Sequence, residues 1–282
     1  MTSGPAEFPK AAEFPEASAF LELAREAAAA GAAVLAGRSA GALEVSNKGD
    51  SGDWVTAFDL AAEAAVREVI TGARPEDTIT GEEGGTVLPE TASGFRWSVD
   101  PLDGTTNFIR NIVYYGTSVA VAGPDGAWLA GVVHPPALGR VYYASRGHGA
   151  WLEENGRRTA LNGPVPGRTG QILATGFSYD PAVRAEQASG LAGLMDGFAD
   201  VRRLGSAALD LCLVADGTHD AYGERGLNEH DFAAGALIAE EAGCWVRRPR
   251  LTSVLDGGPS DEERLAAWTC AGPLELSGKF PL

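Results

Sequence analysis

Hydrophobic positions recur at near-helical spacing in two segments near the start of the chain. The first, over residues 16–35, places apolar side chains three or four positions apart and predicts a helix. The second, over residues 60–70, is shorter and is followed by Gly and Pro, which end helices. Asp59 stands near its start, where a carboxylate caps free backbone N–H groups. Residues 1–15 are rich in Pro and Ala, so we expect a flexible N-terminal arm there.

Strand-like patterns follow the second helix. A short strand is expected over residues 78–80. Further strands are separated by turns that contain Gly, Pro or Asp, and they cover residues 115–122, 128–134, 140–144 and 149–152. Short connections of this kind are typical of an antiparallel meander.

The pattern changes after Asn162, where predicted strands and helices alternate as in an α/β layer. The strands cover residues 172–175, 201–204 and 221–222, and the helices cover residues 181–195, 207–215 and 231–242. We therefore predict an α/β fold of layered α+β type. A single domain over residues 16–282 would comprise an antiparallel-sheet half over about 16–156 and an α/β half over about 157–282.

Composition narrows the possible functions. The chain is long enough for a sizeable core, since 45% of its 282 residues are hydrophobic. Its formal charge is −16, from 22 basic and 38 acidic residues, and no basic patch is visible, so nucleic-acid binding is not expected. The three cysteines are far apart in apolar company, which favours buried reduced thiols over zinc or disulfides. No segment is long and apolar enough to span a membrane, and we expect a cytoplasmic protein.

The segment over residues 97–108, W-S-V-D-P-L-D-G-T-T-N-F, is the most informative stretch. It ends an apolar strand with two carboxylates, Asp100 and Asp103, and then turns over Gly104 and two threonines. At the carboxyl edge of a sheet, such carboxylates can hold a hard cation and free N–H groups can hold an anion. The two aspartates can point to the same side, with the Leu102 carbonyl between them.

Further carboxylates lie at predicted strand ends or helix starts, namely Asp59, Glu82, Glu83 and Asp231. Mg²⁺ prefers oxygen ligands and keeps some waters for a substrate to displace, so these acids are candidate ligands. Simpler explanations remain open for each acid. Asp100 and Asp103 could form an Asx-rich turn without chemical meaning, and Asp59 and Asp231 could cap helices.

The spacing of the acids excludes two other kinds of site. An EF-hand loop has acids at alternate positions and Glu at the twelfth, but the third residue from Asp100 is Leu102 and the twelfth is Asn111. Phosphatases with a nucleophilic aspartate carry D-x-D-G-T, whereas two residues separate the acids here, which fits metal ligation better. The glycine patterns of P-loop and Rossmann proteins are also missing.

Three motifs together resemble the inositol monophosphatase family. They are G-E-E over residues 81–83, the segment over 97–108, and D-F-A-A-G-A-L-I-A-E-E-A-G over 231–243, and the resemblance covers about residues 16–274. It implies an α-β-α-β-α sandwich of the inositol monophosphatase and fructose bisphosphatase type. It also implies Mg²⁺-dependent hydrolysis of phosphomonoesters by metal-activated water, commonly in a homodimer, with lithium inhibition of many members.

The resemblance assigns expected roles to residues of this chain. The metal ligands would be Glu82, Asp100, the Leu102 carbonyl, Asp103 and Asp231. Glu82, Thr105 and Asp59 would be catalytic, with Thr105 orienting the attacking water and Asp59 bonded to Thr105. The substrate-facing positions would be Gly104, Thr105, Thr106, Ser206, Ala207, Glu224 and Asp231. Lys48 falls on a Gly- and Ser-rich segment over residues 38–54 that corresponds to the family's mobile, metal-sensitive loop.

Two positions depart from the family pattern. His230 stands where a tryptophan usually precedes the aspartate, and Cys244 stands where a second glycine is common. His230 could alter the pocket wall, or could act as an added metal ligand or acid.

The sequence predicts inositol monophosphate or a similar polyol phosphate as substrate. The Glu224 carboxylate resembles the inositol-type pattern and can accept hydrogen bonds from polyol hydroxyls. The same acid would suit the amine of histidinol phosphate, and Arg225 could favour a second phosphate, so histidinol-phosphate phosphatase or another sugar or nucleotide phosphatase remains the alternative. A non-catalytic regulatory homologue is a further rival. The expected partners are a small phosphorylated metabolite and a second copy of the chain, without nucleic acid or membrane.

Overall fold

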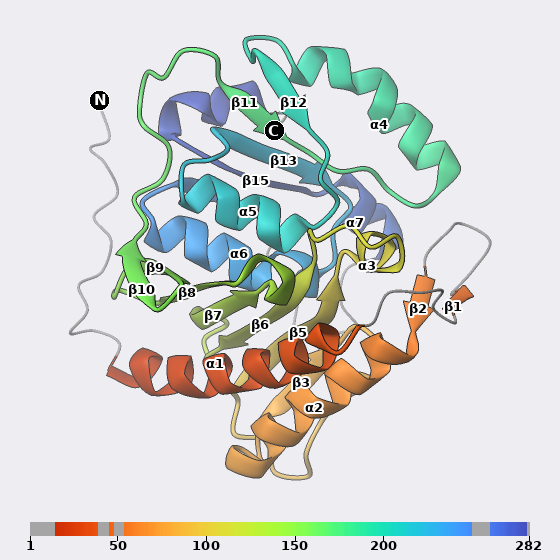
Figure 1. Cartoon of the computed structure of the whole chain (residues 1–282), viewed down its shortest axis with the longest axis vertical. Helices are drawn as coiled ribbons and strands as arrows, with labels where there is room; N and C mark the ends of the chain where they lie inside the picture. The colour runs from red at the N-terminus through yellow and green to blue at the C-terminus, as the bar shows by residue number, and fades with distance from the viewer. Residues whose placement is uncertain (1–14, 39–44, 48–53, 250–259, 281–282) are drawn as a thin grey trace.

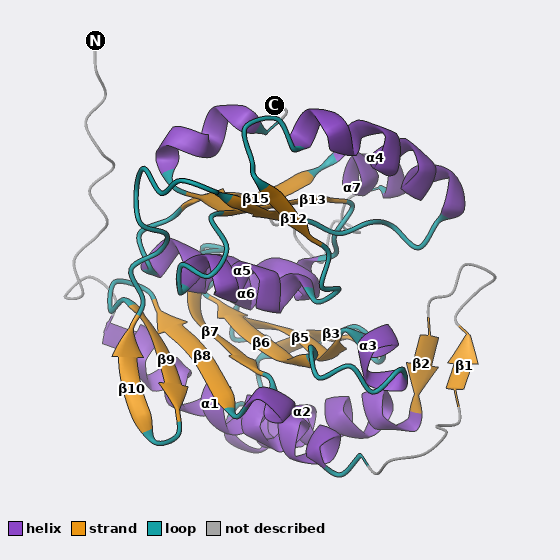
Figure 2. Ribbon diagram, turned by 45° about the horizontal axis from the view of Figure 1, so that its top comes forward, coloured by secondary structure: helices purple, strands orange, loops and turns teal. Residues whose placement is uncertain are grey.

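The computed structural model describes residues 15–38, 45–47, 54–249 and 260–280, and these form five stacked layers. In the view of Figure 2, two helices lie at the bottom, followed by a large sheet, a second pair of helices, a smaller sheet and an outer helical layer. This is the predicted α-β-α-β-α arrangement. Among the described residues, no helix is both long and apolar enough to cross a bilayer.

The first layer contains the two helices that the spacing of apolar residues predicts, α1 (Pro15–Ala36) and α2 (Ala57–Ala73). Helix α2 begins three residues earlier than predicted because Thr56 is its N-cap and not part of a preceding loop. The Thr56 hydroxyl accepts a hydrogen bond from the Phe58 N–H, and the Thr56 N–H donates to the Asp59 carboxylate at 2.7 Å. Asp59 therefore lies inside the first turn and forms a capping box.

The larger sheet has the strand order β10-β9-β8-β7-β6-β5-β3-β4. Its strands are β3 (Thr78–Gly81), β4 (Gly85–Val87), β5 (Arg96–Asp103), β6 (Gly116–Ala122), β7 (Trp128–His134), β8 (Arg140–Ser145), β9 (Ala150–Glu154) and β10 (Arg157–Ala160). Neighbours run antiparallel, as predicted, except that β3 and β5 are parallel. Strand β10 pairs with β9, so the larger sheet extends past residue 156.

The parallel pair of β3 and β5 positions the functional site. Because both strands run in the same direction, their carboxyl ends meet at one edge of the sheet. The residues that follow Gly81 therefore lie beside the end of β5, which carries Asp100 and Asp103. The short helix α3 (Thr105–Ile109) follows directly.

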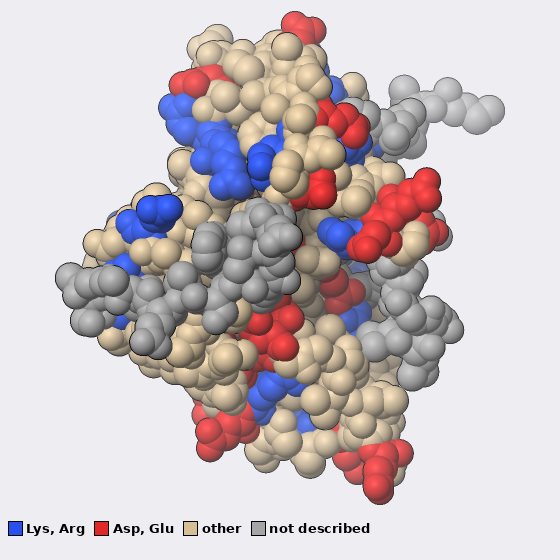
Figure 3. Space-filling model, turned by 90° about the vertical axis from the view of Figure 1, so that its right-hand side faces the viewer, with Lys and Arg blue, Asp and Glu red and all other residues tan. Residues whose placement is uncertain are grey.

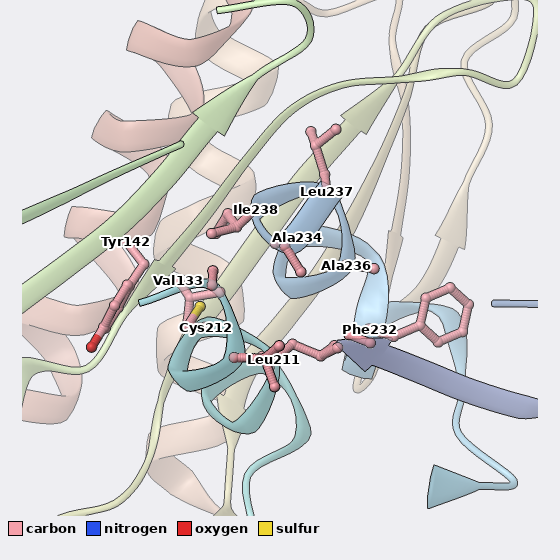
Figure 4. Packing of buried hydrophobic residues seen from close by; sticks show 14 of the residues in the cluster. Val133, Tyr142, Leu211, Cys212, Phe232, Ala234, Ala236, Leu237 and Ile238 are labelled. Atoms are coloured by element: carbon pink, nitrogen blue, oxygen red, sulfur yellow. The ribbon is translucent and has the colours of Figure 1, made fainter. Parts of the chain in front are cut away.

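The central layer consists of α5 (Ala207–Ala215) and α6 (Glu229–Glu241), which are apolar on nearly all sides. Both helices are enclosed between the two sheets, and Figure 4 shows Leu211 and Ile238 facing the same cluster as Val133 and Tyr142 of the larger sheet. Helix α6 begins two residues before the predicted start, because Asn228 is its N-cap.

The smaller sheet has the order β12-β11-β13-β15-β14, with parallel pairing among the first three strands and antiparallel pairing among the last three. Its strands are β11 (Ile172–Ala174), β12 (Asp200–Arg202), β13 (Ala221–Arg225), β14 (Trp245–Arg247) and β15 (Trp268–Gly272). The outer layer contains α4 (Pro181–Leu194), α7 (Asp261–Ala266) and η4 (Leu274–Lys279). Strands β1 (Val45–Asn47) and β2 (Trp54–Thr56) pair beside α2, and η2 (Pro136–Leu138) joins β7 to β8. The sequence did not predict β14 and β15.

The close packing of α5 on α6 gives a stability prediction. A Cβ at Gly235 would lie 2.8 Å from the Ala208 carbonyl oxygen and 2.8 Å from the Leu211 Cβ, so Gly235→Ala must push the helices apart. We expect a loss of about 1–3 kcal/mol in the free energy of unfolding, measured by urea denaturation. Gly190→Ala on α4 is the matched control, because its Cβ would meet nothing within 4 Å and helix propensity favours Ala. Equal effects of the two substitutions would contradict this packing argument.

Candidate active site

Carboxylates from three separate segments meet at the carboxyl edge of the larger sheet. Glu82 follows β3, and its N–H donates to the Val99 carbonyl of β5 at 3.1 Å, which continues the pairing of β3 with β5 by one residue. Asp100 belongs to β5, whose pairing with β6 shifts register between Asp100 and Asp103. Ligand atoms of Glu82, Asp100 and His230 all lie within 4.8 Å of one another. The start of α6 thus closes the cluster that begins at β3 and β5.

A buried ion pair supports the turn that carries Glu82. The Glu63 carboxylate accepts hydrogen bonds from the N–H groups of Glu83 and Gly84, both at 2.8 Å, and from the Arg67 side chain at 2.7 Å. Arg67 in turn donates to the Gly85 carbonyl at 2.6 Å. Sequence analysis missed this pair, although its i,i+4 spacing on α2, shortly before a Gly-rich turn, is a usable signal.

Three aspartates share one pattern of hydrogen bonding. Asp100 accepts the Leu102 N–H at 3.0 Å through Oδ1, and Asp231 accepts the Asn228 N–H at 2.6 Å through Oδ2. Asp103 accepts the Ala208 N–H at 2.7 Å and the Ser206 hydroxyl at 2.6 Å, both through Oδ2. Each side chain is therefore fixed through one oxygen, and the described part of the chain offers no backbone donor to the other oxygen.

The Thr105 hydroxyl lies between two acceptors. Its Oγ1 is 3.2 Å from Asp59 Oδ1 and 3.1 Å from the Leu102 carbonyl oxygen. Asp59 is itself held by Thr56, whose hydroxyl donates to Asp59 Oδ2 at 2.6 Å. Asp59 is fully buried. The helix cap of α2 and the Thr105 contact are therefore two uses of the same carboxylate, and helix capping does not exclude a role at the site.

Burial and mutual repulsion perturb the acids of the cluster. Desolvation, with a smaller contribution from Glu82, raises the pKa of Asp100 well above its ordinary value. Burial raises the pKa of Asp103 to about 8 despite the hydrogen bond from Ser206, and burial also raises the pKa of Asp231. Carboxylates that repel one another in a buried site accept protons or a cation. Oxygen donors at this density are the ligands that Mg²⁺ and similar cations take, so these residues fit a divalent metal.

The raised pKa of Asp103 makes metal-free stability depend on pH. Because the folded-state value of about 8 exceeds the unfolded value of about 3.9, the folded protein binds the extra proton between these limits. Stability is then greatest below the unfolded pKa and is lost as pH rises toward 8. We expect the melting temperature of the metal-free wild type to fall more between pH 6 and 8.5 than that of metal-free Asp103→Asn. Each kcal/mol of lost stability should lower the melting temperature by about 2–4 °C. Parallel melting profiles of the two proteins would contradict this linkage.

A cavity of about 600 Å³ opens beside the cluster. Its lining includes Glu82, Asp103, Gly104, Ser206, Ala207 and Asp231. Glu224, near the end of β13, also lines the cavity, and its carboxylate accepts a hydrogen bond from the Tyr222 hydroxyl at 2.8 Å. Burial raises the pKa of Glu224 to about 7, opposed by Tyr222 and by the charge of Arg203. Arg203, Arg225 and Arg264 also line the cavity, so it combines acidic and basic walls.

The structure brings most of the predicted site residues together. Gly104 adopts a left-handed conformation with φ 96°, which lets the chain turn from β5 into α3, where Thr105 and Thr106 form the first turn. Ser206 and Ala207 line the cavity, but the Ser206 hydroxyl is donated to Asp103, which makes Ser206 a support for that carboxylate as well. Lys48 lies outside the described residues, as does most of its loop.

His230, one of the two departures from the family pattern, lies beside this acidic cluster. Its Nε2 lies 3.6 Å from Asp231 Oδ1, and its ring reaches the cluster of Glu82 and Asp100. The other three histidines, His134, His148 and His219, belong to no such cluster among the described residues. Cys244 is buried and, like the other two cysteines, unpaired.

One face of the molecule carries charged side chains of both signs. On the face shown in Figure 3, acidic side chains gather near the middle, and basic side chains lie above and below them.

Comparison with known proteins identifies relatives over nearly the whole chain. The model of the inositol monophosphatase family matches residues 16–267. Inositol-1-monophosphatase of Mycobacterium leprae is 42% identical over 223 residues, covering 78% of this chain and 76% of that protein. Nus factor SuhB of Escherichia coli is 44% identical over 204 residues, covering 72% of this chain and 74% of that protein.

Solved structures agree with these matches. The extragenic suppressor protein suhB of Bartonella henselae superposes with a TM-score of 0.77 at 32% identity, over 92% of this chain and 95% of that one. Inositol monophosphatase from Anabaena superposes with a TM-score of 0.74 at 29% sequence identity, over 93% of this chain and 94% of that one. The predicted layered fold is thereby confirmed. The chain therefore belongs to the inositol monophosphatase family, a family of metal-dependent phosphomonoesterases.

Proposed function

We propose that the protein hydrolyses the phosphate monoester of a small polyol in a Mg²⁺-dependent reaction, with inositol monophosphate as the substrate. The observation that carries this proposal is that ligand atoms of Glu82, Asp100 and His230 at the start of α6 lie within 4.8 Å of one another, beside a cavity that Glu224 also lines. Oxygen donors at this density suit Mg²⁺.

The metal-holding residues in this proposal are Glu82, Asp100, the Leu102 carbonyl, Asp103 and Asp231. When bound, Mg²⁺ supplies an activated water and neutralises charge on the phosphate and on the leaving oxygen. The protein contributes position, since phosphoryl transfer depends mainly on placing the reactants and stabilising charge.

Thr105 and Asp59 are assigned to the attacking water. The Thr105 hydroxyl is already within hydrogen-bond distance of Asp59, which can hold the hydroxyl proton so that the Thr105 oxygen accepts from water. Burial raises the pKa of Asp59, the nearby charge of Glu82 raises it further, and we assign Glu82 to the attacking water as well. Backbone N–H groups of the turn at Gly104, Thr105 and Thr106 are assigned to the phosphate.

The alcohol is assigned to the part of the cavity lined by Ser206, Ala207 and Glu224. A carboxylate at Glu224 can accept hydrogen bonds from ring hydroxyls, and a substrate without them would leave it unpaired in a buried position. This argument favours a polyol. The amine of histidinol phosphate satisfies the same carboxylate and is the main alternative, while Arg203 and Arg225 would favour a second phosphate.

The test is phosphate release from a panel of inositol 1-phosphate, histidinol phosphate, fructose 1,6-bisphosphate and adenosine 3′,5′-bisphosphate, each with Mg²⁺. We expect the highest kcat/KM for inositol 1-phosphate. Preference for histidinol phosphate would overturn the substrate and leave the reaction intact. If no substrate of the panel releases phosphate, the alternative of a non-catalytic regulatory homologue is favoured. The Escherichia coli relative, which is named a Nus factor, is the reason to retain that alternative.

A homodimer and a cytoplasmic location also remain proposals, based on the family, and no nucleic-acid or membrane partner is proposed. Light scattering of the purified protein measures its oligomeric state directly. A monomer at micromolar concentration would overturn it.

A further inference from the structure

His230 lies in the proposed metal cluster, although it is not among the ligands assigned above. One of its ring nitrogens lies within 4.8 Å of carboxylate oxygens of both Glu82 and Asp100. Its Nε2 is also 3.6 Å from Asp231 Oδ1. The imidazole is therefore close to three of the proposed oxygen ligands, which come from the turn after β3, from β5 and from α6.

Polar contacts anchor the residues on both sides of His230. Arg96 of β5 forms a two-pronged ion pair with Glu229, the residue before His230, with Nη2 at 3.0 Å from Oε2. The residue after it, Asp231, is fixed by the Asn228 N–H. His230 therefore stands on the anchored first turn of α6 and not on a loop.

Two simpler roles fit less well. As an ion-pair partner of Asp231 alone, His230 would need no approach to Glu82 and Asp100, yet it lies near both. As a general acid to the leaving alcohol, it would have to face the cavity, whose lining includes Asp231 but not His230.

We propose that His230 is a nitrogen ligand of the metal centre and shifts the preference of this protein from Mg²⁺ toward Mn²⁺ and other divalent transition metals. Imidazole binds such metals well, whereas Mg²⁺ prefers oxygen and gains little from nitrogen. This inference rests on the proposed function only in taking the carboxylate cluster as the metal site.

Electron spin echo spectroscopy of the full-length protein loaded with Mn²⁺ tests the ligand without an activity assay. We expect ¹⁴N coupling to Mn²⁺ that is replaced by the ¹⁵N pattern when the protein is grown with ¹⁵N-histidine. The wild-type protein suffices for this measurement, so a variant that fails to fold does not prevent it. Absence of histidine nitrogen coupling at a site that binds Mn²⁺ overturns the proposal.

Titration of metal binding by calorimetry assigns the nitrogen to one residue. His230→Gln should lose the coupling and bind Mn²⁺ at least about 10-fold more weakly. Its affinity for Mg²⁺ should change less than about 3-fold, since Mg²⁺ takes oxygen ligands. His148→Gln is the matched control, because His148 lies in the turn between β8 and β9, with Nδ1 at 2.8 Å from the Arg146 carbonyl.

The outcomes separate this inference from the proposed function. Histidine coupling that depends on His230, without phosphate release from any substrate, supports the ligand and overturns the phosphatase proposal. Normal phosphate release with unchanged Mn²⁺-to-Mg²⁺ preference in His230→Gln overturns the ligand alone.

Discussion

Asp103→Asn is expected to lower kcat for phosphate release by more than about 100-fold, since even residues that only support metal ligands cost 10–100-fold when replaced. The asparagine oxygen can still accept from the Ala208 N–H and the Ser206 hydroxyl, which hold Asp103 in the wild type. The remaining atom becomes an NH₂ group, which cannot bind a cation. The substitution should therefore remove a ligand and keep the fold.

The matched control for this prediction is Asp77→Asn, another buried aspartate with several donors. Asp77 accepts from the Trp97 ring N–H at 2.9 Å and from Ser93 at 2.6 Å, near the opposite end of β5. Its replacement should reduce stability and leave the kcat of folded protein nearly unchanged. Full activity of Asp103→Asn at saturating Mg²⁺ would remove Asp103 from the set of ligands.

Thr105→Val is expected to lower kcat by about 100-fold or more with little change in KM, which is the range for losing a group that handles a proton. Valine keeps the shape of threonine and loses only the hydroxyl that lies between Asp59 and the Leu102 carbonyl. Substrate binding through the metal and phosphate contacts should persist. Steady-state kinetics on the preferred substrate gives both constants.

Thr105→Ser separates the hydroxyl from the rest of the side chain. It should recover most of the activity, because the hydroxyl returns without the methyl group. Asp59→Asn is less clean, since Asp59 also accepts the Thr56 N–H that caps α2. If Thr105→Val raises KM and leaves kcat unchanged, Thr105 binds substrate and does not orient water.

Local sequence signals predicted the half of the site that lies close together in the chain. Asp100, Asp103 and Thr105 fall within six positions, and an apolar strand followed by acids and a Gly-Thr-Thr turn indicates a sheet edge. Local patterns also indicated an antiparallel half and an α/β half, whereas the order of the five layers came from the family resemblance. What local pattern could not supply was the direction of β3 relative to β5, since strand pairing depends on contacts distant in sequence.

The sequence predictions missed features that depend on tertiary contacts. The starts of α2 and α6 were misplaced because polar caps, Thr56 and Asn228, lie before the apolar repeat that defines a helix in sequence. Strands β14 and β15 are short and follow no clear alternation. The i,i+4 spacing of Glu63 and Arg67 indicates an ion pair, but it does not indicate the turn that the pair supports, which lies some 20 positions away.

Anomalous diffraction from crystals grown with Mn²⁺ and inorganic phosphate tests the central claim most directly. The claim is that the carboxylates at the ends of β3 and β5 and at the start of α6 form one metal centre for phosphate. The account predicts an Mn²⁺ peak in contact with Glu82 and Asp100, with Asp103 or Asp231 as a further ligand and phosphate on the cavity side. A cluster without Mn²⁺, or phosphate bound elsewhere in the molecule, would contradict it.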